Sequence, residues 1–130
     1  MRLTDFSDYS LRTLIYLNRE QRQVTMNELA EKLHVSRNHL IKVVVRLTRA
    51  GYVESVRGRS GGLEISPRAG SLKLGDILLT TEEGFDLAEC FRNPDTECPF
   101  FPSCKLKKTL NHALDAFIST LNQQTLDDVT

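Results

Sequence analysis

The chain has 130 residues and a formal net charge of zero, with 40% hydrophobic and 26% charged residues. These values are ordinary for a soluble globular protein and give enough length for one domain with a real core. The start of the chain has no apolar stretch like that of a signal peptide, and no run approaches the ~20 apolar residues that span a membrane. We therefore expect a cytoplasmic protein whose cysteines stay reduced.

The charge is segregated along the chain, although it sums to zero. Residues 37–68 carry seven Lys or Arg against two Glu, a net of +5. Residues 76–98 carry seven Asp or Glu against one Arg, a net of −6. The first stretch can meet a polyanion, whereas the second would repel it. Chance is the alternative explanation of this segregation.

Two helices are predicted near the N-terminus. Residues 6–18 follow helical spacing, and Ser7 or Asp8 can cap this first helix. Thr25 and Glu28 fit a capping box, in which each side chain bonds the free backbone N–H of the other residue. A second, short helix is therefore expected directly after Thr25.

A third helix and a β-hairpin follow. After a tight break at His34-Val35, Ser36 caps a helix that ends at Gly51, as Gly commonly ends helices. Two short alternating runs, residues 52–56 and 63–66, flank a Gly-rich loop and predict a hairpin. The apolar positions that the third helix turns inward are Leu40, Val43, Val44 and Leu47. Two helices joined by a short turn and followed by a hairpin indicate a winged helix-turn-helix.

The second half of the chain predicts two more helices around an irregular loop. Residues 72–79 can form a short helix, and Pro94, Pro99 and Pro102 keep the following loop irregular. Residues 105–121 predict a helix ~25 Å long, at 1.5 Å per residue. Its apolar stripe is formed by Leu106, Leu110, Ala113, Phe117 and Leu121.

These elements define a mainly α fold with a small β-hairpin wing. We place the winged helix-turn-helix DNA-binding domain at residues 1–80, and the cluster-binding cysteine loop with a long C-terminal dimerisation helix at residues 81–130. Dimerisation is assigned to this helix because its apolar stripe is more than one small domain needs, with packing inside one chain as the alternative. Residues 125–130 are expected to fray.

A winged helix-turn-helix presents the first turn of its second helix to the major groove of DNA. Here that turn carries an Arg, which can bind guanine bidentately, and an Asn, which can do the same for adenine. Arg side chains among glycines at the hairpin tip suit a narrow groove. The candidate DNA-binding residues are Ser36, Arg37, Asn38, His39, Lys42, Arg46, Arg49, Arg57 and Arg59. The alternative is a winged helix that contacts protein, with these basic residues merely solvated.

The three cysteines of the chain, Cys90, Cys98 and Cys104, fall within one short acidic stretch. An odd number cannot pair completely as disulfides, and the wide gaps lack the close pairs typical of structural zinc sites. Wide gaps suit an iron–sulfur cluster held by thiolates. A zinc site and a metal-free redox thiol site are the alternatives. Three cysteines leave one cluster position for another ligand, for which His112 and Asp8 are candidates.

Several stretches resemble the Rrf-type bacterial transcription regulators, and among them the nitric-oxide-sensing repressors. They are residues 35–40 (VSRNHL), 49–53 (RAGYV) and 56–62 (VRGRSGG), residues 1–4, the Asp8-Tyr9 pair, and the three-cysteine loop that runs into a long helix. The resemblance covers nearly the whole chain. Its specific part is the Ser-Arg-Asn-His helix start combined with the cysteine loop, since the Gly-Gly wing alone marks only the wider family.

The resemblance implies a homodimeric repressor on a palindromic promoter site in double-stranded DNA, with an iron–sulfur cluster near the dimer interface and nitric oxide as effector. A 4Fe-4S cluster is favoured over a 2Fe-2S cluster. The implied ligands are Cys90, Cys98, Cys104 and, from the partner subunit, Asp8. Another branch of the family places a His three residues after its last Cys, and Lys107 at this position argues against that branch.

We do not expect an enzyme, because the sequence contains no nucleophile–base motif, phosphate-binding glycine loop or cofactor fingerprint. The glycines of residues 58–62 lack the strand–helix setting that a phosphate loop requires. The alternative function is a zinc- or thiol-based redox transcription regulator of the same fold.

Overall fold

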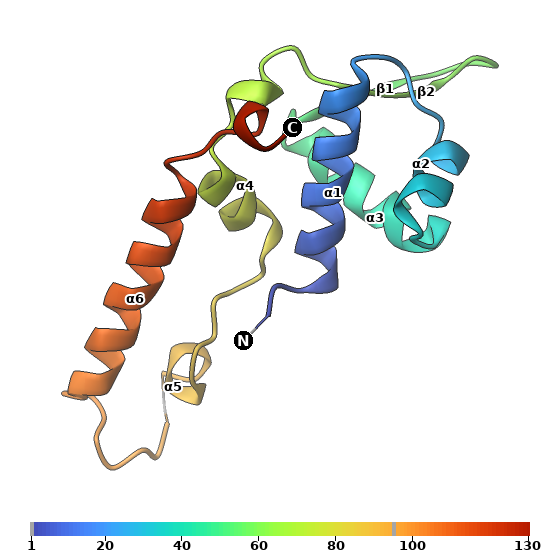
Figure 1. The fold of residues 1–130 in the computed structure, drawn as a ribbon. Helices are drawn as coiled ribbons and strands as arrows, with labels where there is room; N and C mark the ends of the chain where they lie inside the picture. The colour runs from blue at the N-terminus through green and yellow to red at the C-terminus, as the bar shows by residue number, and fades with distance from the viewer. Residues whose placement is uncertain (1, 95) are drawn as a thin grey trace.

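A computed structural model describes residues 2–94 and 96–130 of the protein. Met1, part of the N-terminal segment that carries the family resemblance, and Asp95, within the cysteine loop, lie outside the described residues. The elements in chain order are α1 (Asp5–Glu20), α2 (Met26–Leu33), α3 (Arg37–Arg49), β1 (Val53–Val56), β2 (Gly62–Ile65), η1 (Ala69–Ser71), α4 (Leu74–Thr81), α5 (Glu89–Arg92), α6 (Lys105–Leu121) and η2 (Asp127–Val129) (Figure 1). This arrangement confirms the predicted mainly α fold with one small hairpin.

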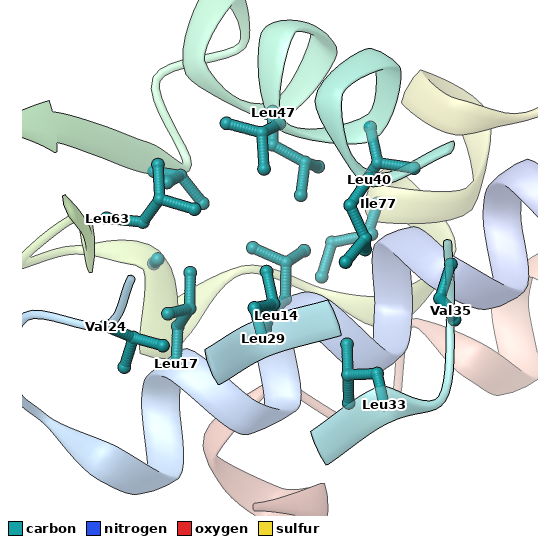
Figure 2. Close-up of a cluster of buried hydrophobic side chains, with 14 of the residues drawn as sticks. Leu14, Leu17, Val24, Leu29, Leu33, Val35, Leu40, Leu47, Leu63 and Ile77 are labelled. Atoms are coloured by element: carbon teal, nitrogen blue, oxygen red, sulfur yellow. The ribbon is translucent and has the colours of Figure 1, made fainter. Parts of the chain in front are cut away.

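The core lies where α1, α2, α3 and the base of the hairpin meet (Figure 2). Leu14 of α1, Leu29 of α2, Leu40 and Leu47 of α3, and Ile77 of α4 are all fully buried. The inward face of α3 is formed by Leu40, Val43, Val44 and Leu47, as its helical spacing predicts. Burial of this face leaves the opposite face of α3 exposed.

The predicted caps Thr25 and Ser36 are confirmed, whereas the cap of α1 differs from the prediction. Thr4, and not Ser7 or Asp8, caps α1, because the Thr4 hydroxyl accepts a hydrogen bond from the Ser7 N–H at 3.2 Å. The Ser7 side chain is instead buried against α4. At α2 half of the capping box forms: the Thr25 hydroxyl accepts from the Glu28 N–H at 3.1 Å. The Glu28 carboxylate accepts instead from the guanidinium of Arg22 and from the Tyr16 hydroxyl, which lower the pKa of Glu28.

The hairpin is antiparallel, and β2 forms backbone hydrogen bonds on both of its edges. Val53 pairs with Ile65 and Val56 pairs with Gly62. On the edge away from β1, β2 exchanges two backbone hydrogen bonds with the segment before α2: Val24 and Leu63 each donate to the carbonyl of the other, at 2.9 and 2.8 Å. The wing is therefore fixed to the helix-turn-helix at its base, and its tip projects away from the body (Figure 1).

The prediction that residues 125–130 fray is wrong. Leu126 is fully buried in the core, and its backbone N–H donates to the Leu72 carbonyl at 2.9 Å. The Asn18 amide donates to the Asp127 carboxylate at 2.8 Å and to the Thr130 hydroxyl at 3.0 Å. The chain after α6 thus returns to the winged helix and packs against α1. The boundary predicted at residue 80 stays a prediction.

Helix α6 lies apart from the winged helix along most of its length (Figure 1). None of its residues is buried, and it is attached at its C-terminal end, where Asn122 and Asp76 exchange two hydrogen bonds of 3.1 Å. The four-residue helix α5 interrupts the loop that was predicted to be irregular. Among the residues that the structure describes, no helix combines the length and the apolar character needed to cross a lipid bilayer.

Candidate nucleic-acid interface and cysteine site

The first turn of α3 is preorganised and exposed. His34 ends α2 in the left-handed conformation, and Ser36 caps α3 by accepting from the His39 N–H at 3.4 Å. The Ser36 hydroxyl also lies 3.0 Å from the His39 ring nitrogen Nδ1. The side chains that this turn presents to solvent are Arg37, Asn38 and His39. The helix start therefore offers donors and acceptors in the place from which a recognition helix reads DNA.

Arg37 is held between α2 and the wing. Its guanidinium donates a 2.7 Å hydrogen bond to the side-chain carbonyl of Asn27 in the first turn of α2. Both residues line an open cleft of about 370 Å³ whose other wall is the wing, including Ser55, Gly58 and Gly61. The cleft places the Arg37 guanidinium at the start of α3 beside the wing, the second element predicted to contact DNA.

The outward face of α3 mixes basic, polar and apolar side chains. Asn38, Lys42 and Arg49 are exposed there, as predicted for a DNA-contacting face. Ile41 and Val45 are also exposed, at 44% each, although sequence reasoning did not select them. Helical spacing alone could have found them, because both fall opposite the buried face. Exposed apolar side chains on such a face can contact the methyl group of thymine.

Arg46 lies on the flank of α3 and not on its outward face. Its guanidinium donates two hydrogen bonds, of 3.0 and 2.9 Å, to the Thr80 carbonyl in α4. The Thr80 hydroxyl in turn lies 3.0 Å from the Tyr52 hydroxyl at the base of the wing. Arg46 therefore ties α3 to α4, a contact that its charge and spacing in the sequence did not predict.

The wing tip carries two exposed arginines, Arg57 and Arg59. Gly58, between them, has a φ of 122°, which L side chains rarely adopt. A Cβ atom at Gly61 would lie 2.6 Å from the Val56 carbonyl oxygen, so this turn also needs a residue without a side chain. The glycines close the tip tightly and leave both guanidinium groups free to reach a groove.

The three cysteines belong to α5, the loop after it and the start of α6, and these segments lie at the end of the molecule away from the wing (Figure 1). Cys90 belongs to α5, Cys98 to the following loop, and Cys104 caps α6, where its sulfur accepts from the Lys107 N–H at 3.4 Å. All three are free and half-buried. Within residues 2–94 and 96–130, however, no three His, Cys, Asp or Glu side chains form a group that could hold a metal ion.

The two candidates for a fourth ligand lie elsewhere. His112 is exposed on α6, two turns beyond Cys104. Asp8 is exposed on α1 and pairs with Arg12 at 3.3 Å. The Arg12 guanidinium also donates to the Leu33 carbonyl at the end of α2, and it lies over the ring of Tyr9 at 5.8 Å. Asp8 is thus connected to the helix-turn-helix within its own chain.

The fold and the exposed α3 face define this protein as a winged helix-turn-helix transcriptional regulator. A family model for Rrf2, described as an iron-dependent transcriptional regulator, matches residues 3–130. The chain therefore belongs to the Rrf2 family, as its sequence motifs suggested, and it is not an enzyme. Regulators of this family bind DNA, which gives the exposed residues of α3 and the wing their expected partner.

Curated relatives and solved structures agree with this assignment. The chain is 40% identical to the HTH-type transcriptional regulator NsrR of Bacillus licheniformis, covering 99% of this chain and 92% of the relative. It is also 40% identical to NsrR of Bacillus subtilis, over 99% of this chain and 90% of the relative. The structure of T. potens IscR superposes with a TM-score of 0.77 at 22% identity, covering 99% of this chain and 85% of the other, which shows the shared fold.

Proposed function

We propose that this regulator is a cytoplasmic homodimeric repressor that holds an iron–sulfur cluster on Cys90, Cys98 and Cys104 and releases DNA in response to nitric oxide. One observation carries the proposal: three free, half-buried thiols surround the start of an exposed helix in a chain 40% identical to regulators named NsrR. The winged helix supplies the DNA-binding half of this function, and the cysteine loop supplies the sensing half.

Three cysteine thiols suit an iron–sulfur cluster, although the described residues do not bring them together as one group of ligands. Thiolates are the ligands that such clusters take, and the Cys104 sulfur already accepts a backbone hydrogen bond of the kind that stabilises a thiolate at a helix start. The described residues form no ready group of three ligands, so binding would have to draw the loop from Cys90 to Cys104 together. When bound, the cluster supplies iron that can react with nitric oxide.

A second copy of the chain is the proposed partner of α6. Leu106 is 65% exposed and Phe117 is 36% exposed, and the 17 residues of the helix present an apolar stripe ~25 Å long. Burial of such a stripe stabilises association at roughly 25 cal/mol per Å² of apolar surface. A two-fold dimer would set two α3 helices into successive major grooves about 34 Å apart, which matches a palindromic site.

Within each subunit, the proposed DNA contacts divide by role. Arg37 and Asn38 are assigned to base edges, because both stand in the first exposed turn of α3. Lys42 and Arg49 are assigned to phosphates, and the arginines of the wing tip to the adjacent minor groove. Ser36 and His39, bonded to each other, complete the helix start.

The sensing step is proposed to reach DNA through α1. If the partner subunit's loop takes Asp8 as its fourth ligand, α1 is fastened to that loop. Arg12 then links the Asp8 carboxylate to the Leu33 carbonyl at the end of α2, and the Tyr9 ring lies 6.0 Å from the His39 ring at the start of α3. Loss of the Asp8 ligand would free α1 and allow the two winged helices to leave the spacing that DNA requires.

Anaerobic purification followed by a visible spectrum tests the proposal. The expected result is a brown protein whose colour and DNA affinity both fall on titration with nitric oxide. A colourless protein that binds DNA equally well with and without nitric oxide would overturn it.

The second candidate is a zinc- or thiol-based redox regulator of the same fold. The observation in favour of its thiol-based form is that the three cysteines are free while the described residues bring no three metal ligands together. Zinc analysis and reversible thiol oxidation of the colourless protein would distinguish these two forms.

A further inference from the structure

We infer that Lys107 is a positioning residue that fastens the segment carrying Cys90 to the helix that begins at Cys104. This inference rests on the proposed function, which assigns the cysteines as cluster ligands. Lys107, in the first turn of α6, contacts both Cys90 and Cys104. Its backbone N–H donates to the Cys104 sulfur at 3.4 Å, and its ammonium donates to the Cys90 carbonyl at 2.6 Å.

The ammonium of Lys107 is also enclosed by two aromatic rings. Its nitrogen lies 5.4 Å from the ring centroid of Phe91, next to Cys90, and 5.4 Å from that of Phe101, which precedes Cys104 by three residues. Both distances are within the range of cation–π attraction. The Lys107 side chain is half-buried, whereas the neighbouring Lys105 and Lys108 are exposed.

The contacts of Lys107 join parts of the loop that are distant in sequence. The hydrogen bond to Cys90 spans 17 residues. The bonds around Cys98 are local, since its N–H donates to Thr96 and its carbonyl accepts from Phe101. A charge-assisted bond of 2.6 Å is stronger than these neutral bonds. Lys107 therefore acts as a clasp that limits how far Cys90 and Cys104 separate before any metal is bound.

The alkylation rate of each cysteine in the metal-free protein tests whether Lys107 holds Cys90 close to Cys104. Reduced, metal-free, full-length protein is treated with a maleimide, and the reaction rate of each cysteine is measured by peptide mass spectrometry. Lys107→Leu should speed the reaction of Cys90 about fivefold, which corresponds to ~1 kcal/mol of lost loop stabilisation. Lys107→Arg should remain close to wild type, because it keeps a cation and a donor. Lys108→Leu removes the same charge one residue away and should change no rate.

Equal alkylation rates of Cys90 in Lys107→Leu and Lys108→Leu would overturn the inference that Lys107 positions Cys90. Circular dichroism verifies that each variant is folded. Phe101→Leu is a milder variant that removes one ring, and it should raise the alkylation rate of Cys90 about twofold. The same variants are then purified anaerobically, where Lys107→Leu should lose its visible absorption faster than Lys108→Leu. A colourless wild type would refute the proposed function but leave the alkylation result, and with it the clasp, standing.

Discussion

Replacing Leu126 by Ala should destabilise the whole winged helix, although only four residues follow Leu126 in the sequence. The side chain is fully buried in the core cluster that also holds Leu14 and Ile77, and its backbone N–H donates to the Leu72 carbonyl. A Leu→Ala change at a fully buried site costs about 2–5 kcal/mol, because the lost methyl groups leave a cavity. We take ~3 kcal/mol for Leu126, a large share of the roughly 5–15 kcal/mol that stabilises a domain.

This loss of stability converts into a change in melting temperature. For 130 residues the entropy of unfolding near the midpoint is about 0.27 kcal/mol/K. A loss of ~3 kcal/mol therefore lowers the melting temperature by about 11 °C. Thermal unfolding followed by circular dichroism measures this shift, with the protein concentration held constant because association also adds stability.

Val129→Ala is the matched control for Leu126→Ala. Val129 lies in the same C-terminal turn but is 37% exposed, so its truncation should cost less than about 1 kcal/mol. A fall of less than 3 °C in Leu126→Ala, or equal falls in the two variants, would refute the packing of this turn into the core.

The remaining predictions concern the two halves of the proposed switch. Arg37→Ala should weaken binding to the specific site by about 5- to 150-fold in anisotropy titrations, with a much smaller loss on random DNA; equal losses would make Arg37 a phosphate contact. Arg46→Ala should cost about 1 kcal/mol of stability in urea unfolding, through its lost bonds to Thr80, and should spare DNA affinity. A loss of affinity as large as that of Lys42→Ala would instead assign Arg46 to DNA. Cys98→Ser should abolish the visible absorption and leave a dimer by gel filtration, and a full-strength chromophore would remove Cys98 as a ligand. Asp8→Ala should alter the spectrum or speed cluster loss, whereas an unchanged spectrum and nitric oxide response would exclude a ligand from the partner subunit.

The strongly periodic parts of the fold could be predicted from sequence. The buried face of α3 repeats at helical spacing, so its burial and its exposed first turn followed from the pattern. The helix over residues 105–121 was found for the same reason. Leu126 was missed because a single apolar residue among polar neighbours has no period, and only the tertiary structure shows that the chain turns back onto α1.

Local signals in the sequence do not reveal contacts between residues that are distant along the chain. Thr4 and Ser7 are equally good caps in isolation, and burial of Ser7 against Thr81 decides between them. The DNA contact predicted for Arg46 from its charge stays a prediction, and the structure adds a bond to a carbonyl on α4 that the sequence does not reveal. Ile41 was not considered for DNA binding, because an apolar residue on a helix is expected to face inward. For Ser7 and Arg46 the contact that the sequence did not reveal is distant along the chain, whereas the exposure of Ile41 could have been read from helical spacing.

The most direct test of the proposed switch is the DNA affinity of anaerobically purified wild-type protein before and after nitric oxide, on a duplex selected from a random pool. The proposed function predicts a brown protein whose affinity falls at least tenfold, a coupling of ~1.4 kcal/mol, while Cys98→Ser shows no response to nitric oxide. A brown wild-type protein whose affinity is the same before and after nitric oxide would contradict it.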